Sequence, residues 1–278
     1  MRRSWQVAAS LVGLGLIGTA AFLWLNEPPP PPPPPVASPV TPAPAAVAGP
    51  TLAAAASEPT VQHPIDPGPL EQAVPAPLDV EAALIDLFGR KTVLSMFQLQ
   101  DFPRRVVATV DNLGRSHASV SLWPVNPVGG RFIVEQRNGV EAISADNGLR
   151  YTPYVLLIET VDLRRVAAVY RRLYPLLQKA YEDIGYPRRY FNDRLVDVID
   201  QLLATPEVSG PLSVHLPTIN GPVQPERPWV LYEFDDPALQ TLSSGQSLLL
   251  RMGPVNERRI KAKLAELRQL VTAGDLPR

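Results

Sequence analysis

The chain of 278 residues contains no cysteine, and this absence excludes several kinds of chemistry at once. Structural disulfides, thiolate metal ligands, a cysteine nucleophile and a lipid on an N-terminal cysteine are all ruled out. Only three histidines are present, His63, His117 and His215, and they lie far apart in the sequence. We expect no metal site and no cofactor, because no zinc-binding pattern can be written from these residues.

Motifs that place a nucleophile or bind a nucleotide phosphate are also missing. The sequence contains no G-x-S-x-G turn, no S-x-x-K pair and no P-loop. A triad assembled around His117 or His215 would be the remaining serine-based option, but a single loop histidine is more often a surface residue. The sequence favours a protein that is not an enzyme and indicates no catalytic residue.

Neither sign of charge is in excess. The chain has 26 Lys plus Arg, 27 Asp plus Glu and a formal net charge of -1. A protein that binds nucleic acid through phosphates normally carries a basic patch or stripe. We therefore expect neither nucleic acid nor an anionic membrane surface as the partner of the folded part.

A long apolar run is present near the start of the chain. Residues 5–25 carry no charge, and a helix over them, at ~1.5 Å per residue, matches the ~30 Å hydrocarbon core of a bilayer. Arg2 and Arg3 precede the run, so the positive-inside rule predicts a cytoplasmic N-terminus. Residues 1–26 are thus predicted to anchor a single-pass protein whose C-terminal domain is exported.

Two alternatives remain open for this run. Gly18 and Ala20 could precede a signal-peptidase cut, although the apolar run continues beyond them. Small residues four apart could let two anchors associate weakly, namely Ala9 with Gly13 and Gly15 with Thr19.

Proline dominates the next segment. Residues 27–77 carry more than half of the 33 prolines, including an unbroken run at 28–35, and contain almost no aromatic or charged side chain. Such a composition predicts a disordered linker, stiff over the proline run, rather than a packed domain. A ligand for proline-reading domains is the alternative. A spacer would hold the body away from the bilayer.

Residues 78–278 have the composition of one folded domain. Amphipathic periods and capping residues predict helices over 79–88, 92–99, 104–113, 162–184, 192–203, 237–252 and 256–271. Asn192 is the expected N-cap of one of them. Asn138-Gly139 between alternating runs predicts a β-hairpin over 131–143, and 229–234 is expected to be a strand. The expected fold is mainly α (α+β): a compact multi-helix domain with a small antiparallel β element.

Two long stretches of the body resemble a known bacterial family. Residues 170–208, YRRLYPLLQKAYEDIGYPRRYFNDRLVDVIDQLLATPEV, and residues 230–254, VLYEFDDPALQTLSSGQSLLLRMGP, are similar to the family named Domain of Unknown Function 3014. A proline-rich region after a single anchor is also similar to the layout of that family. The resemblance implies one bacterial domain, so the anchor is expected in a bacterial inner membrane with the C-terminal domain periplasmic. It brings no catalytic or ligand-binding residue to carry over.

The segment around residue 188 has the composition of a binding site. It offers two guanidinium groups and several aromatic rings in a short connection between helices, a mixture suited to sugars, carboxylated glycans or a partner protein. The candidate binding residues are Tyr186, Arg188, Arg189, Tyr190 and Asp193. The alternative is that the aromatic rings pack into the core and the arginines pair with Asp183 and Asp193.

Carboxylates form the other candidate sites. Asp193, Asp197 and Asp200 share one helical face, and Glu233, Asp235 and Asp236 follow one another at the end of the expected strand. An acid and a base about 5–10 Å apart can cut a glycosidic bond without a metal. The alternative is structural, with the first cluster on a solvated face, Asp236 capping a helix and its neighbours pairing with nearby arginines.

These observations predict a membrane-tethered interaction module in a bacterial envelope, bound to an envelope protein or a cell-wall component. Its contact with the inner membrane would be made through residues 5–25. The alternative function is a carboxylate-based envelope hydrolase acting on glycans.

Overall fold

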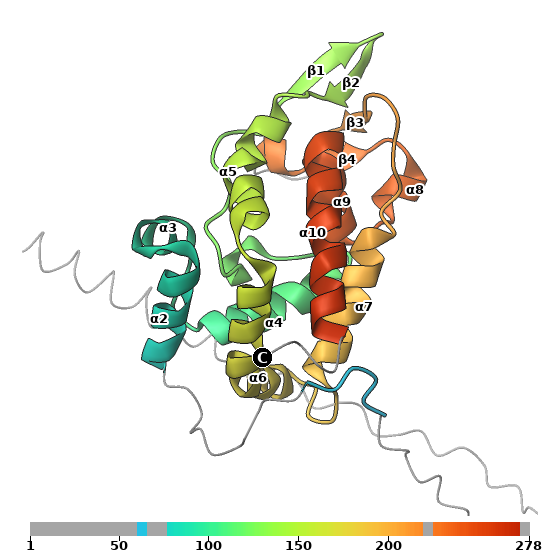
Figure 1. Cartoon of the computed structure of the whole chain (residues 1–278). Helices are drawn as coiled ribbons and strands as arrows, with labels where there is room; N and C mark the ends of the chain where they lie inside the picture. Colours follow the sequence, from blue (N-terminus) through green and yellow to red (C-terminus); the bar gives the residue numbers. More distant parts are fainter. Residues whose placement is uncertain (1–59, 66–76, 219–224, 273–278) are drawn as a thin grey trace, which may run out of the picture. The chain divides into compact units, whose positions relative to one another are not determined.

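The computed structural model describes residues 60–65, 77–218 and 225–272 (Figure 1). The anchor expected at 1–26 lies outside these ranges, as does the expected linker except for 60–65 and Pro77. Within the described ranges, none of the helices combines the length and the apolar character that a membrane crossing needs. The descriptions below therefore concern the body and the short segment 60–65.

The body is built mainly of helices, as the sequence predicts. Its elements in chain order are α2 (Pro77–Phe88), α3 (Arg90–Met96), α4 (Phe102–Leu113), the 3-10 helix η1 (Val120–Leu122), β1 (Val134–Arg137), β2 (Val140–Ile143), α5 (Asn147–Thr160), α6 (Leu163–Asp183), α7 (Phe191–Leu203), β3 (Val214–His215), the 3-10 helix η2 (Pro228–Val230), β4 (Glu233–Phe234), α8 (Pro237–Gln240), α9 (Ser244–Arg251) and α10 (Pro254–Thr272).

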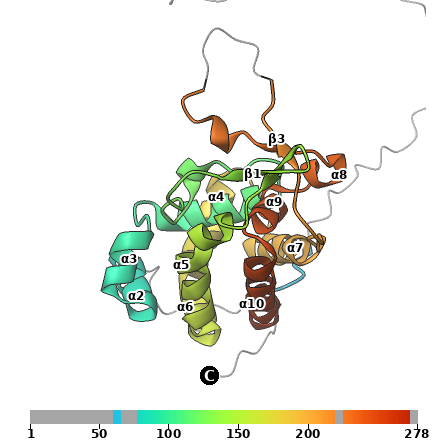
Figure 2. The same cartoon turned by 90° about the horizontal axis from the view of Figure 1, so that it is seen from above.

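The longest predicted helix, α6, forms because its apolar residues recur every three or four positions. Leu173, Leu177 and Tyr181 from that stripe are buried, and Asp162 caps the helix by accepting a hydrogen bond from the Arg164 amide. α4 packs on both α6 and α7, while α10 packs on α5 and α7. Figure 2 shows α5, α6 and α10 from above, with the α2–α3 pair to one side.

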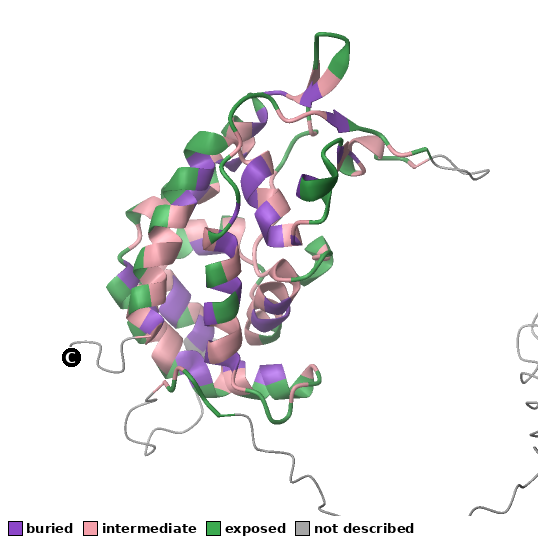
Figure 3. Ribbon diagram, turned by 90° about the vertical axis from the view of Figure 1, so that its right-hand side faces the viewer, coloured by how far each residue is buried: buried purple, intermediate pink, exposed green. Residues whose placement is uncertain are grey.

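The predicted hairpin is confirmed. β1 and β2 are antiparallel, with Val134 opposite Ile143 and Arg137 opposite Val140. The turn residues Asn138 and Gly139 have φ values of 53° and 81°, the left-handed backbone that an Asn-Gly hairpin turn requires. The hairpin projects from the helices, and its tip is exposed (Figure 3).

Three predicted elements differ from the structure. Asn192 is not an N-cap: α7 begins at Phe191 after Tyr190, and the Asn192 side chain is buried. Residues 229–234 are not one strand but η2 followed by the two-residue strand β4. The helix expected over 237–252 is divided into α8 and α9, because Ser243 and Gln246 form a capping box that starts α9.

The sequence analysis did not predict α5, the 3-10 helix η1 or the strand β3 that pairs with β4. The helix α5 contains Pro153 and begins at Asn147-Gly148, and both features are typical of loops. The second sheet pairs β3 with β4, with Val214 opposite Phe234 and His215 opposite Glu233. A two-residue strand is too short to leave a periodic pattern, so only the tertiary fold reveals it.

Candidate functional site

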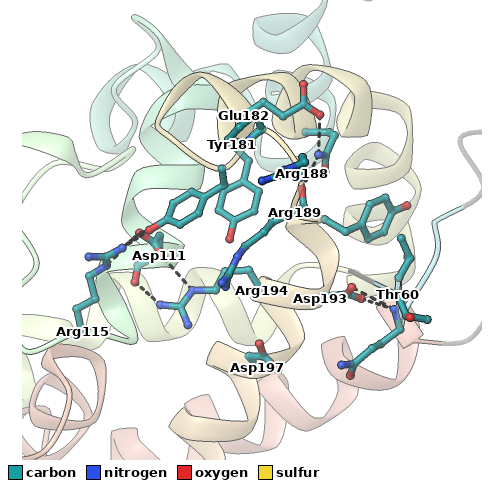
Figure 4. Close-up of a pocket in the computed structure, with 16 residues that line it drawn as sticks. Thr60, Asp111, Arg115, Tyr181, Glu182, Arg188, Arg189, Asp193, Arg194 and Asp197 are labelled. Carbon is teal, nitrogen blue, oxygen red and sulfur yellow. Dashed lines mark hydrogen bonds and ion pairs between the residues drawn. The ribbon is translucent and has the colours of Figure 1, made fainter. Parts of the chain in front are cut away.

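The five residues of the predicted binding site line one cleft of about 640 Å³, bordered by α4, α6 and α7 (Figure 4). Eight charged residues take part in its lining: Asp111, Arg115, Glu182, Arg188, Arg189, Asp193, Arg194 and Asp197. The rings of Tyr181, Tyr186 and Tyr190 also line it, together with Gln178, Pro187 and residues 60–62 of the segment ahead of the body. The connection 184–190 between α6 and α7 supplies one side of the cleft.

Two features hold this connection in place. Gly185 ends α6 with a φ of 118°, a backbone region that residues with a Cβ rarely adopt. Gln178 then binds the returning chain: its amide nitrogen donates to the Arg189 carbonyl at 2.9 Å, and its oxygen accepts from the Phe191 amide at 2.9 Å. Gln178 thereby satisfies one of the free amides at the start of α7.

The aromatic rings are divided between the core and the cleft. Phe191 is fully buried, in a core with Val107 of α4 and Leu177 of α6. Tyr186 is half-buried and stacks on Tyr181, with ring centroids 4.5 Å apart and planes at 20°. Tyr186, Tyr190 and the exposed Arg188 and Arg189 are therefore partly accessible together, as a binding site at this loop requires.

A buried carboxylate forms the floor of the cleft. Asp111 of α4 is only 6 % exposed, and two guanidinium groups approach it (Figure 4). Arg194 donates from Nε to Asp111 Oδ1 at 2.9 Å, and Arg115 lies 2.8 Å from Oδ2. The Tyr186 hydroxyl donates to the same Oδ2 at 3.2 Å, so it is fixed at the floor as well.

This carboxylate shifts the pKa values of its neighbours. The negative charge of Asp111, followed by its hydrogen bond, raises the pKa of Arg115 above its ordinary value. Burial raises the pKa of the Tyr181 hydroxyl, and the charge of Asp111 raises it further. The floor thus combines an ion-paired carboxylate with the protonated hydroxyl of Tyr181 at physiological pH.

The rim of the cleft is arranged differently. The side chains of Arg188 and Arg189 are exposed and make no hydrogen bond or ion pair with another residue that the structure describes. The expected pairs with Asp183 and Asp193 are not formed: Asp183 binds Lys179 at 3.1 Å, and Asp193 accepts from the backbone amides of residues 62 and 63. Two guanidinium groups therefore face solvent beside the cleft.

The second acidic cluster lies elsewhere, at the β3–β4 sheet. His215 Nδ1 is 2.6 Å from Asp235 Oδ1, and its Nε2 is 3.9 Å from Glu233 Oε2. Asp236 caps α8 by accepting from the Ala238 amide at 2.8 Å, as predicted. The partner of Glu233 and Asp235 is thus a histidine, not an arginine. Neither carboxylate lines the cleft.

The first carboxylate cluster is divided by the fold. Asp193 and Asp197 line the cleft, whereas Asp200 binds Arg268 of α10 through two hydrogen bonds of 2.5 and 2.9 Å. Those bonds lower the pKa of Asp200. Among the described residues, no group of three or more His, Asp or Glu side chains is placed to hold a metal ion.

Sequence reasoning missed the floor of the cleft and the residue that holds its loop. Asp111 and Arg115 are four apart on α4, a spacing that indicates an ion pair but not a site. Nothing local connects either of them to Arg194 or Tyr186, and nothing marks Gln178. Only contacts between distant segments bring these side chains together.

Comparison with known proteins shows the family to which the chain belongs. The model of the family described as protein of unknown function (DUF3014) matches residues 102–268, which include α4, α6, α7 and the residues of the cleft from Asp111 to Asp197. No curated protein and no solved structure matches the chain. Since the matched residues make up more than half of the 278, the chain belongs to the DUF3014 family of proteins of unknown function.

Proposed function

We propose that the body is a non-enzymatic binding module, carried outside a bacterial inner membrane by an anchor at 5–25 and a proline-rich tether. The cleft would bind an envelope protein or a cell-wall component through Tyr186, Arg188, Arg189 and Tyr190. The observation that carries this proposal is the contrast between the arginines: Arg115 and Arg194 are paired with Asp111, whereas the two at the rim have no described partner.

The chemistry of the rim points to a ligand with carboxylate groups. A guanidinium group presents a fixed fork of donors that binds a carboxylate through two parallel hydrogen bonds. The partly exposed rings of Tyr186 and Tyr190 offer apolar faces beside these donors. Peptide carboxylates of an envelope protein or of the cell wall combine both properties.

The hydrolase alternative receives less support. It needs two available carboxylates in one cleft, and Asp193 already accepts two backbone amides at 3.1 and 2.7 Å. Glu182 accepts from Gln178 at 2.8 Å, which leaves Asp197 as the cleft acid without a hydrogen bond to any residue that the structure describes. Release of reducing ends from purified cell wall, abolished by Asp197→Asn, would favour the hydrolase over the binding module.

The test is photo-crosslinking in intact cells. A photoreactive residue placed at Arg188 of the full chain should form an adduct with a defined partner, and Arg189→Glu should abolish that adduct. The matched control carries the same residue at Gln136, which is exposed on the hairpin. Equal adducts from both positions, or none from position 188, would contradict the proposal. Recovery of the full chain in the soluble fraction would contradict the tether.

A further inference from the structure

A short piece of the tether lies on the body at the corner where α6 meets α7. Residues 60–65, Thr-Val-Gln-His-Pro-Ile, precede the folded body and fall outside the family match at 102–268. The backbone amides of Gln62 and His63 both donate to the Asp193 carboxylate, at 3.1 and 2.7 Å. The segment 60–65 is therefore bound to a side chain that also lines the cleft.

Two further side chains of the body bind the same segment. The Tyr190 hydroxyl accepts from the Ile65 amide at 2.7 Å and lies 3.3 Å from the Ile65 carbonyl, to which it donates. The buried Asn192 donates from its side-chain amide to the His63 carbonyl at 2.9 Å. The same side chain also binds the Tyr170 hydroxyl and the Val271 carbonyl, so Asn192 joins the segment to the body instead of capping α7.

All of these hydrogen bonds reach main-chain atoms of the segment 60–65. One side chain of the segment, that of Ile65, packs against the aromatic core formed by Tyr174, Tyr181 and Phe191. Pro64 has no amide hydrogen, and it stands at the one position between His63 and Ile65 where no donor is used. The site thus uses two successive free amides and one apolar side chain, and it accepts proline at the position between them because no donor is needed there.

We propose that the corner formed by Tyr190, Asn192 and Asp193 is a receptor for extended polypeptide segments, and that residues 60–65 of the same chain are its resident ligand. This inference deepens the proposed function, on which it rests, by naming an extended peptide as the ligand class. While the segment 60–65 is docked, it occupies Tyr190 and Asp193. A partner peptide must then displace the tether before it can use them.

The contacts between the body and residues 60–65 are few enough for the segment to be released. A few hydrogen bonds, each of small net value, and one apolar side chain oppose the entropy lost when six residues become ordered. Release would free residues 60–65 from the body and lengthen the reach of the body from its anchor by up to about 3.3–3.6 Å per freed residue. Partner binding and tether length are coupled in this way.

The absence of native cysteine allows a direct test of the docked state. Val61, which is exposed, is replaced by cysteine in the full chain and spin-labelled in detergent micelles. We expect a motionally restricted spectrum that becomes mobile in Asp193→Ala and stays restricted in Asp197→Ala. Asp197 is the matched control, because it lines the same cleft one turn further along α7 and binds none of the described residues of the segment 60–65.

Gln62→Pro provides a second variant that leaves the body unchanged and removes one of the donated amides. It should mobilise the label even if Asp193→Ala fails to fold. A mobile label in the parent chain, or equal spectra for the Asp193 and Asp197 variants, would overturn docking. Restriction that increases with protein concentration, together with a dimeric mass, would overturn docking within one chain.

The receptor is tested with a free ten-residue peptide of positions 58–67. The full chain carrying Gln62→Pro and His63→Pro should bind this peptide saturably and at least about tenfold more tightly than the parent chain, because a tethered segment competes at a high effective concentration. The control peptide is N-methylated at the positions of Gln62 and His63. Equal binding of the two peptides, or equal affinity of the two chains, would overturn the receptor.

The label and the crosslink report separately on the two proposals. A mobile label with an intact crosslink from position 188 would remove the peptide receptor and leave the binding module standing. A restricted label without that crosslink would remove the envelope partner at the rim and leave the docking of residues 60–65 standing.

Discussion

The two polar regions indicated by the sequence, the segment 186–193 and the acidic run 233–236, have opposite settings in the structure. The first borders a cleft whose floor is the buried Asp111, held by groups that are 75 and 83 residues away in the chain. The second lies on the surface, where Asp235 and Glu233 keep 37 % and 44 % of their side chains exposed around His215. Carboxylates in the two regions are therefore expected to contribute differently to the free energy of unfolding.

The physical reason is solvation. An exposed ion pair gains little, because water and salt screen it. A buried carboxylate has lost its water and depends on its donors, so removal of either side is costly. Three predictions test whether this contrast holds.

The largest expected effect is that of Asp111→Ala. It leaves Arg115 and Arg194 without their shared carboxylate, and we expect the free energy of unfolding to fall by about 3–5 kcal/mol. Asp235→Ala should cost no more than about 1 kcal/mol. Urea unfolding of both variants measures the difference, and equal losses would erase the contrast between the two regions.

A smaller effect separates arginines within the cleft. Arg194→Met removes two hydrogen bonds to Asp111, one to Oδ1 at 2.9 Å and one to its carbonyl at 2.8 Å, and should cost about 1.5–3 kcal/mol. Arg188→Met should change the free energy of unfolding by no more than about 0.5 kcal/mol, because its side chain is exposed. A large loss in Arg188→Met would show that this residue serves the fold rather than a ligand.

The smallest effect concerns tyrosines at high pH. Burial raises the pKa of Tyr181 in the cleft and of Tyr232 beside the strands, so the folded protein keeps these protons while the unfolded chain loses them above pH 10. Their contribution is complete below pH 10 and is lost as the pH rises, by no more than about 1.4 kcal/mol per tyrosine at pH 11.

Tyr181→Phe should therefore reduce the drop in the free energy of unfolding between pH 8 and pH 11, as measured by urea titration. Tyr232→Phe is the matched variant beside the strands. An unchanged drop in both variants would show that these two hydroxyls do not control alkaline stability.

Much of the fold followed from local patterns. The apolar stripe of α6, the Asn138-Gly139 turn and the cap at Asp236 each depend on residues within a few positions of one another, and the structure confirms all three. The helix α5 and the β3–β4 sheet were missed. Packing overrides the proline and glycine signals of α5, and β3–β4 depends on pairing between His215 and Glu233 rather than on local pattern.

The sequence predicted the loop that borders the cleft but not the floor of the cleft. The aromatic and arginine content of 186–190 indicated a binding loop, because composition shows which functional groups are present. It does not show which distant side chains lie beside them. Asp111 and Gln178 could not be found this way, since their roles come from contacts with Arg194 and Phe191 across the fold. The role of Asn192 could not be predicted either. Its position in the sequence indicates an N-cap, whereas its side chain binds the His63 and Val271 carbonyls.

The sequence by itself determined what the protein is made of: a body without cysteine chemistry, helices placed by apolar periodicity, and a proline-rich segment ahead of them. Those properties belong to single residues or to neighbours within one helical turn. Only the tertiary structure decided which charges are buried and that residues 60–65 bind at Asp193. Such contacts join segments about 130 positions apart, and their strength depends on the water excluded when these segments meet.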